Sequence, residues 1–198
     1  MAIGVIAANK FHFITVTYKR REILFPAFNF SFMATITFKG TPVHTGGELP
    51  SIGSIVPHFE LVKGNLSLLK SDSLMGKRVV LNIFPSLDTG VCATTVRKFN
   101  QLVSDIPNTV VLAVSKDLPF AQSRFCTTEG IKNVIPVSAF RDSKFAEQYG
   151  VEMLDGPLAG LLARAIVVID AKGRVVYTEL VPEITREPNY SAALYALK

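Results

Sequence analysis

The 198-residue chain is 48% hydrophobic, which is enough to bury a sizeable core. Its two cysteines cannot build a disulfide framework or a cysteine-rich zinc site, and no apolar run reaches the ~18–20 residues that a membrane span needs. The formal net charge of +5 suggests an acidic partner, but this charge is unevenly distributed along the chain.

Residues 1–32 differ in composition from the rest of the chain. They carry a net charge of +3 and hold seven of the nineteen aromatic residues. Their apolar start precedes the basic cluster at 19–21, the reverse of the order in a secretory signal peptide. Alternating basic and aromatic residues would also suit a nucleic-acid-binding arm, but we expect no nucleic-acid or membrane partner. We predict an atypical extension, dispensable or due to an early start, before one domain at 33–198 in a cytoplasmic rather than periplasmic protein.

Met33 opens a region in which apolar residues recur with regular periods. Two short hairpins are expected first, at 34–50 and 58–70, with Gly46-Gly47 and Gly64-Asn65 as turn residues. The pattern then predicts, in order, a strand at 78–84, a helix at 92–106, a strand at 109–115, a helix at 118–130, a strand at 133–140, a helix at 142–150, a strand pair at 164–180 and a helix at 189–198. This alternation indicates an α/β fold with a mainly parallel sheet, helices on both faces and antiparallel edge strands.

Cys92 stands at the junction between a predicted buried strand and the following helix. Free N–H groups and the dipole at a helix start stabilise an anion, and the thiolate is the reactive form of cysteine. Thr89 can offer its hydroxyl to the sulfur, and Pro85, which has no N–H, can wall the site without competing for hydrogen bonds. A lone cysteine is usually a small buried hydrophobe. At this kind of junction, where α/β folds bind ligands, we favour a reactive thiol.

The motif that ends at Cys92, Pro-x-x-x-Thr-x-x-Cys, matches the signature of the peroxiredoxin family. Four further segments resemble the bacterial thiol peroxidase branch of that family: 80–100, 115–126, 155–170 and 183–190. The resemblance extends from Met33 to Lys198. It implies a thioredoxin-like fold, with a mixed central sheet flanked by helices and an added N-terminal hairpin. It also implies thioredoxin-dependent reduction of hydroperoxides, a homodimer, and no metal or organic cofactor.

The resemblance also implies a role for each site residue. Cys92 would be the peroxidatic cysteine, whose thiolate attacks the O–O bond and becomes a sulfenic acid. Cys126 would be the resolving cysteine, which forms a disulfide with Cys92. Arg164 would hold the thiolate and the peroxide oxygens, and Thr89 and Pro85 complete the catalytic set. Because the two cysteines are expected in separate helices, we predict that both regions must unwind locally before the disulfide forms.

Two other functions remain compatible with a thioredoxin-like fold. A disulfide oxidoreductase usually carries Cys-x-x-Cys, whereas these cysteines lie 34 residues apart. A redox-inert interaction module would leave the set of Pro85, Thr89, Cys92 and Arg164 unexplained. Thr95 is interpreted as helix packing rather than catalysis. The apolar segment 153–162, which we expect to line the pocket, favours a bulky alkyl or lipid hydroperoxide.

Overall fold

The computed structural model describes residues 3–8, 11–18, 21–26 and 33–198, and it divides into the units Met1–Ser31 and Phe32–Lys198. The first unit contains an antiparallel sheet in the order β1-β2-β3. Its strands are β1 (Ile3–Ala8), β2 (Phe11–Tyr18) and β3 (Arg21–Pro26). The sequence analysis assigned no strands to this segment. Two residues of its basic cluster, Lys19 and Arg20, lie outside the described residues.

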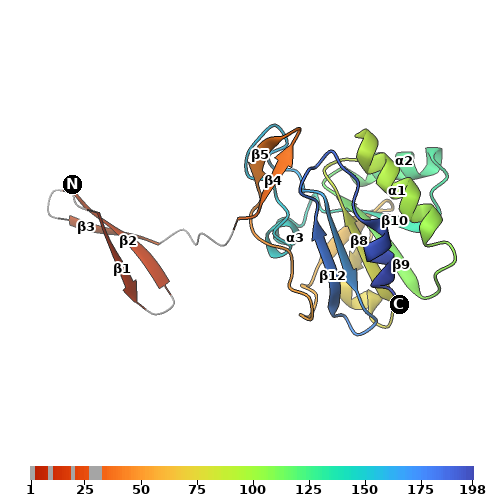
Figure 1. Cartoon of the computed structure of the whole chain (residues 1–198), viewed down its shortest axis with the longest axis horizontal. Helices are drawn as coiled ribbons and strands as arrows, with labels where there is room; N and C mark the ends of the chain where they lie inside the picture. Colours follow the sequence, from red (N-terminus) through yellow and green to blue (C-terminus); the bar gives the residue numbers. More distant parts are fainter. Residues whose placement is uncertain (1–2, 9–10, 19–20, 27–32) are drawn as a thin grey trace. The chain divides into compact units, whose positions relative to one another are not determined.

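The second unit is built around one seven-stranded sheet (Figure 1). Its elements in chain order are β4 (Thr35–Phe38), β5 (Thr41–His44), β6 (Glu60–Lys63), β7 (Leu68–Lys70), the 3-10 helix η1 (Ser71–Leu74), β8 (Arg78–Ile83), α1 (Gly90–Leu102), β9 (Thr109–Ser115), α2 (Pro119–Thr128), β10 (Val134–Ser138), α3 (Ser143–Gln148), β11 (Ala165–Ile169), β12 (Val175–Leu180) and α4 (Tyr190–Tyr195). The sheet order is β12-β11-β8-β9-β10-β6-β7, and β4 and β5 form a separate hairpin. This arrangement confirms the predicted α/β class with a mixed sheet and an added N-terminal hairpin.

Parallel pairing is confined to the centre of the sheet. β8 pairs with β9, and β9 with β10, in parallel. The other four neighbouring pairs are antiparallel. The predicted strand pair β11–β12 is confirmed. The expectation of a mainly parallel sheet was wrong, because the antiparallel hairpin β6–β7 also joins the sheet beside β10. Turn residues predict a hairpin but not where it docks, since docking depends on contacts between distant segments.

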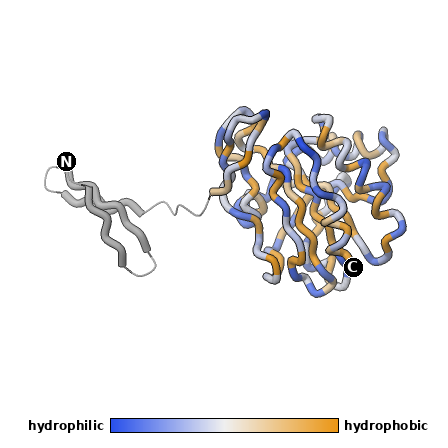
Figure 2. Tube along the Cα trace, viewed as in Figure 1, coloured by the Kyte–Doolittle hydropathy of each residue, from blue (hydrophilic) through white to orange (hydrophobic). Residues whose placement is uncertain are grey.

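The apolar run of β8 is buried on both faces of the sheet, as predicted. Successive side chains of a strand point to opposite faces. Leu81 accordingly packs in a cluster with Phe145 of α3, while Val80 packs in a second cluster with Phe99 of α1. Figure 2 shows the apolar strands running through the interior of this unit. The C-terminal end of β8 is therefore buried, and the connection to α1 begins with residues that are shielded from solvent.

The predicted helices all form, with shifted ends. The first was expected at 92–106 but spans Gly90–Leu102, so it begins earlier and ends earlier. Asp142 caps α3 by accepting a hydrogen bond from the amide of Phe145, as its position suggested. The first hairpin turns at Lys39 and Gly40, both with positive φ, whereas the expected Gly-Gly pair lies beyond β5. Gly47 packs closely against Gly150, so a glycine at position 47 allows these two chain segments to approach each other.

Candidate active site

The fold places Cys92 at the end of β8, in the first turn of α1. The connection from β8 passes Pro85, which is buried, and Thr89 is the N-cap residue of the helix. Cys92 is therefore the third helical residue, where backbone N–H groups have no partner within the helix. Its side chain is fully buried and its thiol is free. The location in the first turn of a helix agrees with the position that the sequence predicted for this cysteine.

Thr89 contacts the sulfur directly. Its Oγ1 lies 2.8 Å from Cys92 Sγ and 3.1 Å from the carbonyl oxygen of Ser86. A hydroxyl has one proton, so it can donate to only one of these acceptors at a time. A negatively charged sulfur is the stronger acceptor of the two. Thr89 can therefore donate a hydrogen bond to a thiolate at Cys92.

Arg164 supplies a buried positive charge on the other side of the sulfur. It precedes β11, whose pairing of Ala165 with Ile83 brings it to the end of β8. Its Nη2 donates to Cys92 Sγ at 3.2 Å and its Nε donates to the carbonyl of Ile184 at 2.9 Å. The side chain is only 1% exposed, and within the described residues no carboxylate forms an ion pair with it. The Nη2 contact places this buried positive charge directly beside the sulfur.

A cavity of about 310 Å³ opens beside these groups. Its lining includes Pro85, Thr89 and Arg164 together with apolar side chains of Phe38, Leu158 and Ile184. Such a mixture of apolar walls and a few convergent polar groups is typical of small-molecule sites. The segment 153–162 was expected to line this pocket, and Leu158 does so. Met153 and Leu162, by contrast, are fully buried in the core.

Cys126 lies in α2 and, like Cys92, is not among the residues that line this cavity. Its thiol is also free, and the residue is 9% exposed. Burial raises the pKa of the Cys126 thiol to about 11. At neutral pH this sulfur is therefore protonated and a weak nucleophile while it remains packed. The structure thus brings together Pro85, Thr89, Cys92 and Arg164 but leaves Cys126 in a separate environment.

Thr95 contributes more than the packing that the sequence suggested. It is fully buried one turn after Cys92, and its hydroxyl donates to the carbonyl of Val91 at 2.7 Å. The oxygen can then accept from Arg164 Nη1, which lies 3.5 Å away. The spacing of three residues places Thr95 on the helix face of Cys92. This three-residue spacing is the feature of the sequence that could have placed Thr95 near Cys92 and Arg164.

Glu183 organises one wall of the cavity and was missed by the sequence analysis. Its carboxylate accepts five hydrogen bonds of 2.7–3.1 Å: from both the amide and the hydroxyl of Thr185, the amides of Lys39 and Gly40, and the hydroxyl of Thr37. The bonds from Thr185 and Gly40 hold the pKa of Glu183 well below its usual range. They tie the β4–β5 turn to the segment that contains Ile184. No local motif reveals the contact between Glu183 and the β4–β5 turn, because Glu183 and Thr37 lie 146 residues apart in the chain.

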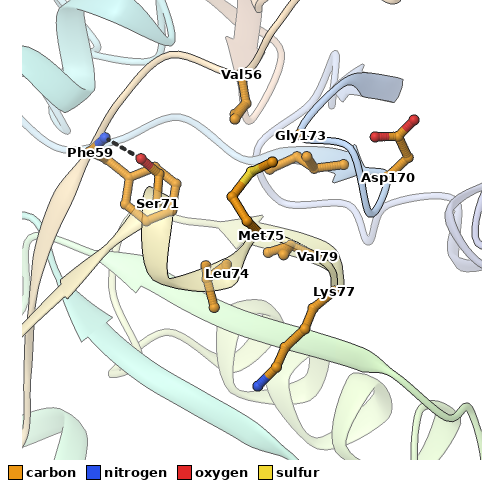
Figure 3. A pocket seen from close by; sticks show the side chains of 10 residues that line it. Val56, Phe59, Ser71, Leu74, Met75, Lys77, Val79, Asp170 and Gly173 are labelled. Carbon is orange, nitrogen blue, oxygen red and sulfur yellow. Dashed lines mark hydrogen bonds between the residues drawn. The ribbon is translucent and has the colours of Figure 1, made fainter.

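A small apolar cavity lies away from these groups. A second cavity, at the opposite end of β8, measures about 20 Å³ and is lined mainly by apolar side chains such as Val56, Leu74 and Met75 (Figure 3). This volume holds little more than one water molecule. No group of three or more histidine, cysteine or acidic residues within the described part of the chain could hold a metal ion. No helix in that part is long and apolar enough to cross a membrane.

Comparison with known proteins gives a consistent result. Residues 51–194 match the Redoxin family model. Over 165 residues the chain is 61% identical to a thiol peroxidase of Mycobacterium tuberculosis, an alignment that covers 83% of this chain and 99% of that protein.

Solved structures agree with the sequence comparison. A peroxiredoxin-like protein from Aquifex aeolicus has a TM-score of 0.79 and 41% identity, covering 83% of this chain and 96% of that one. A thiol peroxidase from Chromobacterium violaceum has a TM-score of 0.76 at 21% identity, covering 82% of this chain and 95% of that one, and this likeness supports the fold alone.

Proposed function

This chain is a thiol-dependent peroxidase of the redoxin family, and we propose that Cys92 is the residue that attacks the hydroperoxide. The observation that carries the proposal is the contact of one buried sulfur with both Thr89 and Arg164 at the edge of an apolar cavity. A buried thiol without these partners would be an ordinary core residue. With them, the sulfur lies beside a hydroxyl and a guanidinium that also line the cavity, so a hydroperoxide bound there can meet the same two donors.

The first step oxidises Cys92. Its thiolate sulfur forms a bond to one peroxide oxygen while the O–O bond breaks, giving a sulfenic acid and, after proton uptake, water or an alcohol. Negative charge moves onto the leaving oxygen in the transition state. Arg164 can donate to that oxygen and to the sulfur through its planar fork, and Thr89 can donate to either atom. Pro85 contributes a wall without a donor that would hold water.

The second step uses Cys126. Its sulfur attacks the Cys92 sulfenic acid, which forms a disulfide and releases water. The dithiol of thioredoxin then reduces this disulfide and restores both thiols. Each cysteine lies in a helix and the packed Cys126 thiol has a raised pKa, so local unwinding before the second step would both bring the sulfurs together and make Cys126 more reactive.

Several finer properties belong to the same proposal. The apolar cavity walls favour alkyl hydroperoxides over hydrogen peroxide alone.

We expect a cytoplasmic homodimer that packs around the active-site loops, as in the family, and sedimentation should give the mass of a dimer at micromolar concentration. We also expect that removing residues 1–32 leaves folding and activity intact, because all the site residues lie in the second unit.

One assay tests the central proposal. The full chain is mixed with thioredoxin, thioredoxin reductase and NADPH, and NADPH consumption is followed after adding a hydroperoxide. NADPH consumption should depend on both peroxide and thioredoxin. In a parallel assay, the chain itself should reduce few insulin disulfides. Mass spectrometry of the oxidised protein should show a bond between Cys92 and Cys126. Peroxide consumption without that bond would contradict the assignment of Cys126.

A further inference from the structure

Asp117 holds the loop that leads into Cys92. It follows β9, and its Oδ1 accepts a hydrogen bond from the hydroxyl of Ser86 at 2.8 Å. Its Oδ2 accepts from the amide of Leu87, also at 2.8 Å. Ser86 and Leu87 lie between the buried end of β8 and the N-cap of α1. One carboxylate outside the cavity therefore fixes the segment on which the position of Cys92 depends.

The same carboxylate is connected to the helix that carries Cys126. Ser115 donates its hydroxyl to Asp117 Oδ2 at 2.8 Å, and Gln122 Nε2 donates to the Ser115 oxygen at 2.9 Å. Gln122 is fully buried in α2, and it precedes Cys126 by four residues, which places both on one helix face. A continuous chain of hydrogen bonds thus runs from the Cys92 loop through Asp117 to the buried face of α2.

The attachment of α2 combines apolar and polar contacts. The helix buries only Pro119, Gln122 and Cys126, and the Oε1 atom of Gln122 has no hydrogen-bond partner among the described residues. Phe125 of the same helix is partly buried against the core cluster that contains Phe99, and Gln122 Nε2 also donates to the carbonyl of Val137 at 3.1 Å. Segments with few buried apolar contacts open at low free-energy cost. The Asp117 chain is one of the contacts that must change when α2 is released.

We propose that Asp117 is a positioning residue that couples the Cys92 loop to α2 and so sets how readily the oxidised enzyme opens to form its disulfide. The inference rests on the proposed roles of Cys92 and Cys126. After the first step, Cys92 sulfenic acid and the Cys126 thiol give the disulfide and water. In competition, a second hydroperoxide oxidises the sulfenic acid to sulfinic acid, breaking its own O–O bond and leaving as an alcohol. Because both reactions consume one intermediate, the rate of opening decides between them.

The test compares Asp117→Ala with the wild type in the full chain. Each reduced protein receives a series of cumene hydroperoxide concentrations, and mass spectrometry gives the ratio of sulfinic acid to disulfide. Losing these hydrogen bonds should lower the sulfinic fraction by about fivefold at a given peroxide concentration. The variant should also have a more negative reduction potential for the Cys92–Cys126 disulfide, because the packed reduced state loses stability. A general loss of stability unconnected with the two cysteines would not shift this potential.

Two further variants keep the test decisive. Ser86→Ala removes a single hydroxyl from the same carboxylate and should shift both quantities in the same direction by a smaller factor, even if Asp117→Ala does not fold. Asp170→Ala is the matched control, since Asp170 accepts backbone amides of Lys172 and Arg174 at 2.8 Å at the opposite end of the sheet. It should leave the ratio and the potential unchanged.

The outcomes separate this inference from the proposed function. A wild-type protein that forms no Cys92–Cys126 disulfide would overturn the proposed function and this inference with it. A wild type that forms the disulfide, with Asp117→Ala or Ser86→Ala leaving both the ratio and the potential as they were, would overturn the inference alone. Equal shifts in Asp170→Ala would also overturn it, because the effect would then not depend on the contacts of Asp117.

Discussion

The two helices that carry the cysteines differ in their buried residues and in the contacts of their sulfur atoms. α1 has thirteen residues and buries five of them: Cys92, Ala93, Thr95, Val96 and Phe99. α2 has ten residues and buries three, of which one is a glutamine. The sulfur in α1 is in hydrogen-bond contact with a threonine and an arginine, whereas burial alone raises the pKa of the thiol in α2.

This difference matches two separate chemical requirements. Attack on a peroxide needs a thiolate in a fixed geometry, which a firmly packed helix start provides. Disulfide formation needs two sulfurs whose Cα atoms approach within about 4.4–6.8 Å, so at least one segment must move. The sulfur held by Thr89 and Arg164 therefore suits the first step, and the sulfur in α2 suits the second.

The largest expected effect comes from removing the reactive sulfur. Cys92→Ser should abolish peroxide reduction, because a serine hydroxyl is not a usable nucleophile near neutral pH. Cys126→Ser is the matched control: it should consume about one equivalent of peroxide rapidly and then fail to turn over with thioredoxin. Stopped-flow mixing with a single hydroperoxide addition measures both. Normal thioredoxin turnover by Cys126→Ser would remove the distinction between the two helices.

Replacing the arginine weakens the site without removing its charge. Arg164→Lys should lower the second-order rate constant for peroxide by about 100-fold, since an ammonium cannot reproduce the planar fork that presents separate N–H donors to the sulfur and the leaving oxygen. The hydrogen bond to the carbonyl of Ile184 would also be lost. Competition kinetics gives the rate constant, and circular dichroism checks the fold. A folded variant within twofold of the wild type would show that the contact with Cys92 is only structural.

Removing one hydroxyl should have a smaller effect. Thr89→Val keeps nearly the same volume but loses the donor to Cys92, which should slow the peroxide step by about 10-fold. Thr94→Val provides a control, because Thr94 is also in α1 but donates its hydroxyl to the carbonyl of Gly90. The same competition kinetics applies to both. Equal rate losses in the two variants would assign the effect to the helix rather than to the sulfur.

The smallest effect is a pH dependence of the α2 region. The pKa of Cys126 is about 11 when packed, against an ordinary value of 9.0. The packed state binds the proton more tightly, so its added stability is complete below pH 9 and is lost as pH rises from 9 to 11. Opening of α2 should therefore increase by about fourfold between pH 8 and 9.5. Hydrogen exchange of α2, corrected for the intrinsic rate, measures this.

The comparison for that pH effect is Cys126→Ser, which cannot ionise at this position. Other groups titrate in the same range in both proteins, so only the difference between their pH profiles reports on the Cys126 thiol. Parallel profiles would mean that the thiol of the wild type does not become exposed when α2 opens.

Local patterns in the sequence were enough to predict the α/β class, the buried strands and the place of Cys92. Their physical basis is short-ranged: side-chain periodicity, turn residues and the free N–H groups at a helix start act within a few residues. The motif from Pro85 to Cys92 lies within eight residues, so its chemistry was visible in one segment. Arg164 was identified from resemblance, and its distance from Cys92 in the chain is 72 residues.

Only the tertiary structure decided which distant groups meet. The antiparallel pairing of β11 with β8 brings Arg164 to Cys92, and the five hydrogen bonds on Glu183 build the cavity wall from two segments far apart in the chain. The link from Ser86 through Asp117 to Gln122 likewise joins three separate segments. A carboxylate placed in a loop does not reveal its donors, because hydrogen bonds depend on where the packed core places both partners.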